Sequence, residues 1–430
     1  MERRIAFVAF YQKENIYSFN ALIGAIETEE LLNDIKIYFI RGYDSLIDEL
    51  KKIIECNDRI IVGISFFTTQ LWEIKDLIKD LRRKYSNKVF LIAGGPHPSG
   101  DPFGTLKMGF NLVVVGEGEE TIIEILKKIK LDEDIFKIKG ISFLNKNNNY
   151  IYTGKRQPID LDKYPSLPMK NIKFGAIEIT RGCPYVCYFC QTPYLLGTNP
   201  RHRSIESICN TVKFMKNYEK TDIRFISPNA FSYGSIDGKN LNLTRLEDLL
   251  KQINHIIKPS GRLFLGSFPS EVRPEHVNKE TLGLVLKYAS NDNIVIGAQS
   301  GSQKVLDLCN RGHTVEEIYK AVELTINSGL KANVDFIFGL PYENEEDVDL
   351  SIKVMKDLSD IGARIHTHTF MPLPQTLFAT KPFQKVNKKI IKVITELNSK
   401  GLAYGEWKRQ EKLAIKIAKY LKSQNTNGLA

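Results

Sequence analysis

The sequence predicts an α/β protein in which a doubly wound, parallel-sheet domain precedes a partial barrel of six strand–helix units. Two observations lead to this prediction: short β-branched apolar runs alternate with amphipathic stretches, and the alternation is interrupted only once. A chain of 430 residues is long enough for two such domains, each with its own core. The expected organisation is a first domain at 1–135, a connector at 136–168, a barrel at 169–380 and a helical C-terminal extension at 381–430.

The first domain is predicted from five segments in which nearly every residue is apolar. A strand with one solvent-exposed face would instead alternate apolar and polar residues. Near-continuous apolar strands that alternate with helices indicate a parallel sheet covered on both faces, in a Rossmann-like arrangement. The expected strands are Ile5–Ala9, Ile35–Ile40, Arg59–Ser65, Val89–Ala93 and Leu112–Val115. Amphipathic stretches such as Ser45–Ile54 and Leu71–Tyr85 lie between them. Such sheets bind ligands at the carboxyl ends of their strands.

Glycine-rich turns follow the third, fourth and fifth of these strands. Glycine lets the backbone approach a large flat ligand, and Ser and Thr hydroxyls can hold its amides or phosphate. None of the turns is a Gly-x-Gly-x-x-Gly fingerprint, and any doubly wound fold needs tight turns, so taken alone they indicate only a possible binding edge. The candidate ligand-binding residues there are Ser65, Thr68, Gly94, Gly95, His97, Gly116, Glu117 and Gly118.

The connector contains a predicted hairpin around the turn Asn145–Asn149, and strand–helix alternation resumes at Gly175. Six strands are expected in the second domain: Ala176–Thr180, Ile223–Ser227, Leu263–Gly266, Ile294–Gln299, Val334–Phe338 and Ile365–Phe370. Six such units predict a partial barrel of the TIM type, with its functional residues at the C-terminal ends of the strands. The segment from Phe383 to Tyr420 is lysine-rich and expected to be helical.

Three of the six cysteines, Cys183, Cys187 and Cys190, stand in one short segment after the first barrel strand. A [4Fe–4S] cluster normally takes four thiolates, so three ligands leave one iron open to bind a small molecule. Buried structural thiols are usually dispersed, a closed zinc site needs four ligands, and a disulfide framework does not suit a chain this long with so few cysteines. An iron–sulfur cluster is therefore the favoured interpretation.

The spacing Cys-x3-Cys-x2-Cys after the first strand of a βα series resembles the cluster loop of the radical S-adenosylmethionine (radical SAM) superfamily. The resemblance implies that the three cysteines hold the catalytic [4Fe–4S] cluster and that its open iron binds S-adenosylmethionine (SAM). Reductive cleavage of SAM then yields a 5′-deoxyadenosyl radical that removes hydrogen from an unreactive C–H bond. Phe189 matches the aromatic position that usually lies against the adenine.

Further motifs at successive strand ends resemble the SAM-binding elements of this superfamily. Ser227-Pro228-Asn229 stands where Gly-Gly-Glu is common, a departure that puts its role in doubt. Each motif also has a purely structural explanation as a helix cap, a backbone contact or a packing turn. The implied SAM-binding residues are Phe189, Ser227, Asn229, Glu271, Gln299, Ser300, Ile337 and Gly339. His366 and His368 point to one side of an extended segment and are expected to contact cofactor or substrate, with metal ligation or proton donation as alternatives.

The turns Gly-Gly-Pro-His-Pro at 94–98 and Gly-Glu-Gly-Glu at 116–119, together with the cysteine motif, resemble the cobalamin-binding class of the superfamily. This resemblance implies that the first domain holds cobalamin through the candidate residues named above. The Asp-x-His-x-x-Gly signature that supplies a cobalt-binding histidine in other members is missing, because Phe10–Asn15 stands in its place. His97 is either a cofactor contact or a turn histidine bonded to backbone.

The resemblance implies a cobalamin-dependent radical SAM methyltransferase, similar to archaeal-type members and among them the glutamine C-methyltransferase group. One SAM would methylate the cobalamin, a second would generate the radical, and the methyl group would pass to an unactivated carbon of a protein, peptide or small molecule. A low-potential electron donor would be required. A rearrangement or cyclisation without methyl transfer, or a non-catalytic cobalamin- or cluster-binding sensor, are the alternatives.

Composition narrows the partners that we expect. The net charge is +10, but the lysines are spread along helices and mixed with acids, which favours a solvated surface over nucleic-acid binding. The first domain has a single cysteine, Cys56, so it lacks the ligands for a second cluster, and the tail does not resemble the small β-barrel that RNA-modifying relatives append. The chain has no apolar run of membrane-spanning length and no signal peptide, so a cytoplasmic protein is expected. The sequence does not indicate an oligomeric state.

Overall fold

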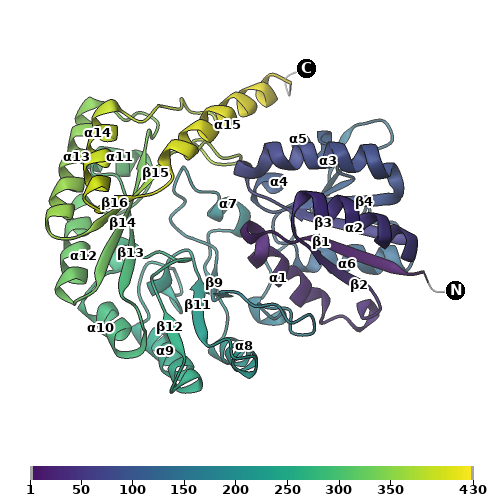
Figure 1. The fold of residues 1–430 in the computed structure, drawn as a ribbon, viewed down its shortest axis with the longest axis horizontal. Coiled ribbons are helices and arrows are strands. Elements are labelled where there is room, and N and C mark those ends of the chain that lie inside the picture. Colours follow the sequence, from purple (N-terminus) through teal and green to yellow (C-terminus); the bar gives the residue numbers. More distant parts are fainter. Residues whose placement is uncertain (1–2, 428–430) are drawn as a thin grey trace. The chain divides into compact units, whose positions relative to one another are not determined.

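The computed structural model describes residues 3–427, and the chain divides into two compact units (Figure 1). We call residues 1–175 the N-terminal unit and residues 176–430 the barrel unit. No helix within the described residues is both long and apolar enough to cross a membrane.

The N-terminal unit is built on a seven-stranded sheet in the order β2-β1-β3-β4-β5-β6-β7. The strands are β1 (Ile5–Phe10), β2 (Lys36–Ile40), β3 (Arg59–Ser65), β4 (Val89–Gly94), β5 (Leu112–Val114), β6 (Ile141–Leu144) and β7 (Tyr150–Tyr152). The first five are parallel, so the order 2-1-3-4-5 confirms the predicted doubly wound arrangement.

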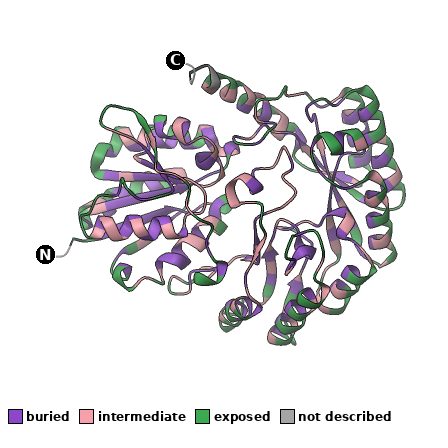
Figure 2. Cartoon of the chain, turned by 180° about the vertical axis from the view of Figure 1, so that it is seen from behind, coloured by how far each residue is buried: buried purple, intermediate pink, exposed green. Residues whose placement is uncertain are grey.

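Helices cover both faces of this sheet (Figure 1). They are α1 (Ile16–Ile26), α2 (Tyr43–Cys56), α3 (Leu71–Tyr85), α4 (Pro96–Gly100), α5 (Pro102–Lys107) and α6 (Glu119–Lys130). All six residues of β1 are buried, and Figure 2 shows the central strands as buried while the outer helix faces are exposed. Burial on both faces explains why these strands are apolar at every position rather than at every second one.

The predicted hairpin belongs to this sheet rather than to a separate connector. β6 pairs antiparallel with β5, with Ile141 opposite Val114, and β7 pairs with β6. Without the hairpin, β5 would expose unpaired backbone groups along its outer edge. Residues 136–168 therefore extend the N-terminal unit.

The barrel unit contains two curved parallel sheets, β12-β11-β8 and β13-β14-β15-β16. The strands are β8 (Ile177–Glu178), β11 (Asp222–Ile226), β12 (Arg262–Phe264), β13 (Asn293–Gln299), β14 (Lys331–Phe338), β15 (Arg364–Thr369) and β16 (Ala403–Tyr404). An isolated parallel bridge pairs Val272, in the segment after β12, with Ile296 of β13. A short antiparallel pair, β9 (Thr180–Arg181) and β10 (Arg201–His202), flanks the cysteine segment.

Six helices lie along the outside of these strands (Figure 1): α8 (Ile205–Asn217), α9 (Leu243–Ile257), α10 (Lys279–Tyr288), α12 (Val315–Asn327), α13 (Glu345–Asp360) and α14 (Lys388–Ser399). The unit also contains α7 (Thr192–Leu196), α11 (Gln303–Leu308) and α15 (Trp407–Asn427). Side-chain caps start several of them: Ser204 accepts from the backbone N–H of Ser207, and Asn344 from that of Asp347.

The expected C-terminal extension is not purely helical. Between α14 and α15, β16 adds a seventh parallel strand beside β15, and α15 packs against β15. A strand of two residues is too short for its pattern to stand out in a lysine-rich helical segment. Residues 428–430 of the extension lie outside the described part of the chain.

Candidate active site

The three-cysteine segment forms a tight loop between β9 and α7. Gly182 has a φ of +90°, and a Cβ there would lie 2.4 Å from the backbone oxygen of Asn199, so only glycine fits. The backbone N–H of Cys183 donates to Gly197 O at 3.0 Å, and that of Cys190 to Cys187 O at 3.0 Å. These bonds fold the loop so that the cysteines face one another rather than spread along a strand.

All three thiols are free of disulfides, and they lie close enough together that Cys187 raises the pKa of Cys183 and both raise the pKa of Cys190. Burial raises the pKa of Cys183 and raises that of Cys190 to about 11. Three gathered thiols with no fourth cysteine in the loop are the donor set of a cluster with one open iron. The residues present therefore fit a [4Fe–4S] cluster.

A turn far along the chain holds this loop. The backbone N–H of Tyr188 donates to Cys309 O at 3.0 Å, and Asn310 Nδ2 donates to Tyr185 O at 2.8 Å and to Val186 O at 3.2 Å. The non-glycine residue Val186 keeps a φ of +50°, a conformation that such neighbours must stabilise. The sequence contains no signal for this contact.

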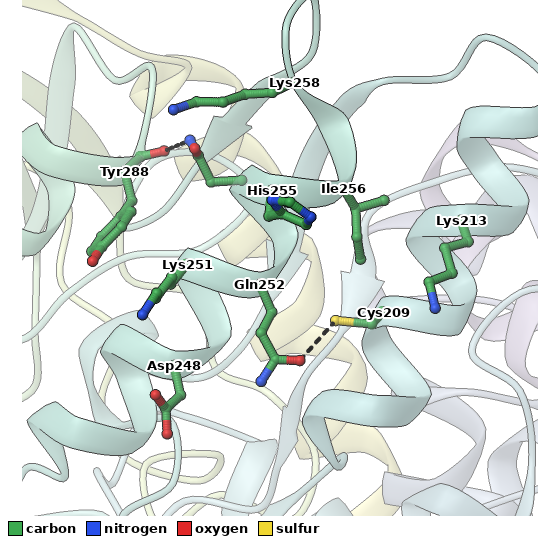
Figure 3. A pocket seen from close by; sticks show the side chains of 10 residues that line it. Cys209, Lys213, Asp248, Lys251, Gln252, His255, Ile256, Lys258 and Tyr288 are labelled. Atoms are coloured by element: carbon green, nitrogen blue, oxygen red, sulfur yellow. Dashed lines mark hydrogen bonds between the residues drawn. The ribbon is translucent and has the colours of Figure 1, made fainter.

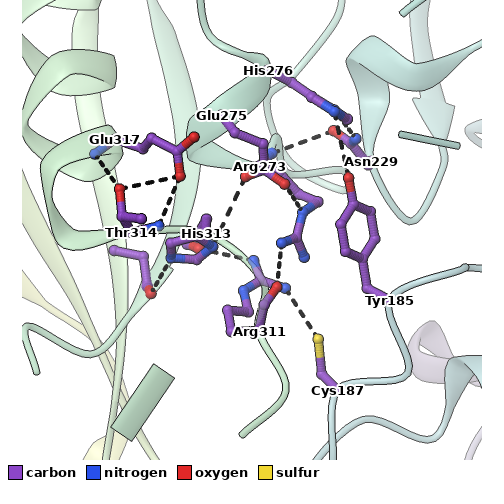
Figure 4. Close-up of polar contacts among 12 residues, drawn as sticks. Tyr185, Cys187, Asn229, Arg273, Glu275, His276, Arg311, His313, Thr314 and Glu317 are labelled. Carbon is purple, nitrogen blue, oxygen red and sulfur yellow. Dashed lines mark hydrogen bonds and ion pairs between the residues drawn. The ribbon is translucent and has the colours of Figure 1, made fainter. Parts of the chain in front are cut away.

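Arg311 places a buried cation beside the thiols (Figure 4). Its Nη1 lies 3.6 Å from Cys187 Sγ, its Nη2 donates to Gly297 O at 2.8 Å, and Nη2 lies 3.8 Å from Glu271 Oε1. A guanidinium keeps its charge even when buried. The predicted cluster ligands therefore lie beside a buried positive charge that sequence reasoning did not predict.

A second layer of charges supports Arg311 (Figure 4). The guanidinium of Arg273 donates to Arg311 O, pairs with Glu275, and lies 3.4 Å from the centre of the Tyr185 ring. The Nε2–H of His313 donates to Ala298 O at 3.1 Å, and burial lowers the pKa of this histidine. This network fixes Arg311 from several directions.

The side chains of Ser227 and Asn229, which were predicted to contact SAM, form hydrogen bonds within the protein. Ser227 Oγ donates to Asn229 O at 2.9 Å. Asn229 Oδ1 accepts from the Arg273 backbone N–H at 3.3 Å, and its Nδ2 contacts His276 Nδ1. These bonds shape the loop after β11, so a direct role in holding SAM stays a prediction without added support.

Glu271 and Gln299, also predicted to contact SAM, do come together. A Cβ on Gly297 would lie 2.7 Å from Arg311 Nη2, 2.9 Å from Gln299 Nε2 and 3.1 Å from Glu271 Cδ, so the three side chains converge there. Burial raises the pKa of Glu271 to about 7, helped by Asp335 and opposed by Arg311. Gln299 is buried with a φ of +74°, the kind of strain that clusters at functional sites.

The remaining predicted SAM residues lie in the same region of the barrel unit. Phe189 and Ile337 pack against one apolar cluster, which suits a pair of residues proposed to flank an adenine. Ser300 Oγ lies 3.4 Å from Ser351 Oγ and serves the turn that precedes α11. The backbone N–H of Gly339, whose φ is +73°, donates to Glu343 Oε2 at 3.2 Å.

In the N-terminal unit the predicted ligand-binding turns lie at the carboxyl ends of β3, β4 and β5. A Cβ on Gly94 would meet nothing within 4 Å, so open space lies in front of that strand end. Gly95 has a φ of +92°, and its Cβ would lie 2.6 Å from Ser65 Oγ. His97 is fully buried with Nδ1 3.1 Å from Thr68 Oγ1, and burial lowers its pKa to about 4. The His97 ring is thus part of the interior.

The residues of the turn after β5 form contacts within the protein. The backbone N–H of Gly116 donates to Ser99 Oγ at 3.0 Å, Glu117 Oε2 accepts from the Ile159 N–H at 3.1 Å, and a Cβ on Gly118 would lie 2.8 Å from Leu22 Cδ2.

Gln12, which follows β1, was not predicted as a site residue. Its buried side-chain Nε2 has no hydrogen-bond partner among residues 3–427. An unpartnered amide and the open space at Gly94 fit a large amide-bearing ligand such as cobalamin.

A cavity of about 710 Å³ lies elsewhere on the barrel unit (Figure 3). It is lined by residues of α8 and α9, together with Lys258 and Tyr288, and Cys209 Sγ faces Gln252 Oε1 there at 3.9 Å. None of the predicted site residues lines this cavity.

Comparison with known proteins agrees with this assignment. A family model described as the radical SAM superfamily matches residues 177–355, and a B12-binding domain model matches residues 28–126. These ranges fall in the barrel unit and the N-terminal unit, respectively. The two models imply a [4Fe–4S] cluster, SAM and cobalamin as cofactors.

Curated relatives cover most of the chain at low identity. The uncharacterised methyltransferase PH0819 of Pyrococcus horikoshii is 27% identical over 79% of this chain and 72% of its own length. The uncharacterised protein MJ1620 of Methanocaldococcus jannaschii is 27% identical over 74% of this chain and 69% of its own.

Two solved structures share the fold. The radical SAM methyltransferase TsrM from Kitasatospora setae, with cobalamin and a [4Fe–4S] cluster bound, has a TM-score of 0.66 at 17% identity, over 88% of this chain and 77% of its own. The cobalamin-dependent radical enzyme OxsB, with aqua-cobalamin and SAM bound, has a TM-score of 0.63 at 18% identity over 82% of this chain. The present chain spans 52% of OxsB. Residues 177–355 therefore belong to the radical SAM superfamily, and residues 28–126 belong to the B12-binding domain family.

Proposed function

We propose that the protein is a cobalamin-dependent radical SAM methyltransferase that methylates a carbon atom of a substrate, either an unactivated carbon in a protein or peptide or one in a small molecule. The observation that carries the proposal is the pairing of a B12-binding domain with a radical SAM domain whose three thiols are gathered at the strand ends. A relative that covers most of the chain is named a methyltransferase, as is TsrM.

The cofactors, when bound, supply a deoxyadenosyl radical from SAM and a methyl carrier in cobalamin. The chain's own residues position them. Cys183, Cys187 and Cys190 would hold the cluster, and Arg311 would keep a positive charge beside it. Glu271 and Gln299 supply polar groups near Arg311, while Phe189 and Ile337 offer an apolar surface for the adenine. In the N-terminal unit, Gln12 and the open space at Gly94 would receive cobalamin.

Methyl-labelled SAM tests the proposal. The anaerobically purified protein, reconstituted with iron, sulfide and cobalamin and reduced by a low-potential donor, would be incubated with candidate peptides, glutamine-containing peptides among them, and analysed by mass spectrometry. We expect label in the product and formation of both deoxyadenosine and S-adenosylhomocysteine. Deoxyadenosine without label in any product would instead indicate a rearrangement or cyclisation. No SAM cleavage by the reduced, reconstituted protein would indicate a sensor.

A further inference from the structure

The side chains of Asp335, His366 and His368, on the neighbouring strands β14 and β15, bring together three atoms that can bind a metal ion. Asp335 Oδ1 lies 2.8 Å from His366 Nδ1 and 3.8 Å from His368 Nε2, and the two nitrogens are 3.1 Å apart. Ligands bound to one metal ion at about 2.1 Å, at angles between octahedral and tetrahedral, lie about 3.0 to 3.4 Å apart. The observed separations are close to this range.

Paired strands rather than flexible loops hold these residues. Asp335 on β14 is the register partner of His366 on β15, and His368 lies two residues further on the same face. The His366 ring stacks on Tyr404 of β16, with centroids 4.4 Å apart and an interplanar angle of 9°. Rigid placement of this kind is what a metal site requires.

Without a metal, the three contacts require a particular placement of protons. Gln410 Oε1 accepts from the Thr369 N–H at 2.8 Å, so its Nε2 faces His368 Nδ1 at 3.2 Å and places the proton of neutral His368 on Nε2. If His366 Nδ1 also carries a proton, two N–H groups 3.1 Å apart point at one carboxylate oxygen. If it does not, its lone pair faces that oxygen at 2.8 Å.

A cation is an alternative to this arrangement because it accepts a lone pair from each of the three atoms. The proton of His368 then lies on Nδ1, and the Gln410 carboxamide must turn its oxygen toward it. Metal-bound histidines commonly donate their outer N–H to such an acceptor. Gln410 of α15 is therefore the residue whose chemistry distinguishes the metal-bound from the metal-free arrangement.

We propose that Asp335, His366 and His368 bind one divalent first-row transition-metal ion, in addition to the iron–sulfur cluster. Two imidazoles and one carboxylate are a ligand set that suits Zn²⁺ or Fe²⁺. The side chains of His366 and His368 are 30% and 29% exposed, so the site opens on one side. Three protein ligands leave positions for an oxygen or nitrogen donor of a bound small molecule.

Anaerobic Co²⁺ titration of the full-length protein with Cys183, Cys187 and Cys190 replaced by Ala tests the site without interference from the cluster. We expect one equivalent of Co²⁺ with d–d absorption and no sulfur-to-cobalt charge-transfer band. In that background, His366→Ala and His368→Ala should each weaken binding at least 100-fold. His255→Ala, on the exposed face of α9, is the matched control and should bind as before. Absence of Co²⁺ binding, or equal binding in the His366 and His368 variants, would overturn the proposal.

A second variant keeps the test decisive if the histidine variants misfold. Gln410→Glu offers a carboxylate to His368 Nδ1–H while still accepting from Thr369, so it should tighten Co²⁺ binding about tenfold. Gln410→Leu removes the acceptor and should weaken it by a similar factor. If Gln410→Glu binds Co²⁺ no more tightly than the unchanged residue, His368 is not a ligand.

Discussion

The two units present different chemistry at the same topological position, the carboxyl ends of their parallel strands. In the N-terminal unit this edge offers glycine turns, hydroxyls and the Gln12 amide, and burial keeps His97 neutral near physiological pH. In the barrel unit the edge gathers buried charges, with Arg273 and Arg311 close to the cysteines. Many weak neutral contacts suit a large amide-bearing ligand, whereas fixed charges suit a compact charged cofactor. The difference teaches that strand topology sets the place of binding and side-chain charge sets the kind of ligand.

The strongest test of this contrast removes the cluster ligands. Replacing Cys183, Cys187 and Cys190 with Ala should abolish bound iron, the visible absorption of the cluster and SAM cleavage, because no thiolates remain to hold the iron. Cobalamin binding, measured by its own absorption after gel filtration, should persist. Cys209→Ala, a buried cysteine on α8, is the control and should keep full iron content. Iron retained in the triple variant would contradict the assignment.

A substitution at Gly94 tests the other edge. Gly94→Leu should fold normally, because nothing lies within 4 Å of the added Cβ, and it should weaken cobalamin binding about tenfold to hundredfold by filling the open space. Equilibrium binding of hydroxocobalamin measures this effect. Gly283→Leu on α10, which is equally open, should bind cobalamin normally. Unchanged affinity in Gly94→Leu would move the cobalamin site elsewhere.

The charge beside the cysteines should affect the cluster itself. A cation 3.6 Å from Cys187 Sγ favours the more negative, reduced cluster. Arg311→Met should therefore lower the ratio of reduced to oxidised cluster at a fixed potential about tenfold, equivalent to about 59 mV. Electron paramagnetic resonance during a redox titration measures the ratio.

Two control variants separate the effect of the Arg311 charge from a structural effect. Arg311→Lys should restore part of the shift because it keeps the charge but not the guanidinium geometry. Arg262→Met removes an exposed arginine of the same unit and should leave the ratio unchanged. If Arg311→Met and Arg262→Met behave alike, Arg311 has only a structural role.

The two units should also differ in the pH dependence of their stability, with opposite directions. Burial lowers the pKa of His97 from 6.5 to about 4, so its contribution is present above pH 6.5 and is lost as the pH falls toward 4. Burial raises the pKa of Glu343 from 4.5 to about 7, so stability is lost as the pH rises from 4.5 through 7. Each shift corresponds to roughly 3 kcal/mol at most.

Urea unfolding midpoints between pH 4 and pH 8 measure both effects. His97→Asn should reduce the loss of stability at low pH. Glu343→Gln should reduce the loss of stability at high pH, and its amide oxygen can still accept from the Gly339 N–H. The exposed Glu323→Gln should change neither. Parallel pH profiles of wild type and Glu343→Gln would show that Glu343 is ionised without cost in the folded protein.

Local patterns predicted much of the molecule. The apolar strands of the N-terminal unit lie within a residue or two of their predicted ranges, because burial on both faces leaves a continuous apolar signature. The cluster loop was predicted because its three ligands are close in sequence. The two-residue strand β16 and the membership of the β6–β7 hairpin in the first sheet were missed, since very short strands leave little periodicity and an edge pairing has no local signature.

The sequence by itself determined that the chain forms two α/β units, and it predicted that three cysteines hold one cluster. Only the tertiary structure decided which side chains surround that cluster. Arg311 reaches Cys187 across 124 residues of sequence, and Gln410 reaches His368 across 42. The same packing directed Ser227 and Asn229 into loop contacts and gathered Asp335 with His366. Contacts between residues far apart in sequence follow from long-range strand pairing and burial, which short sequence patterns do not encode.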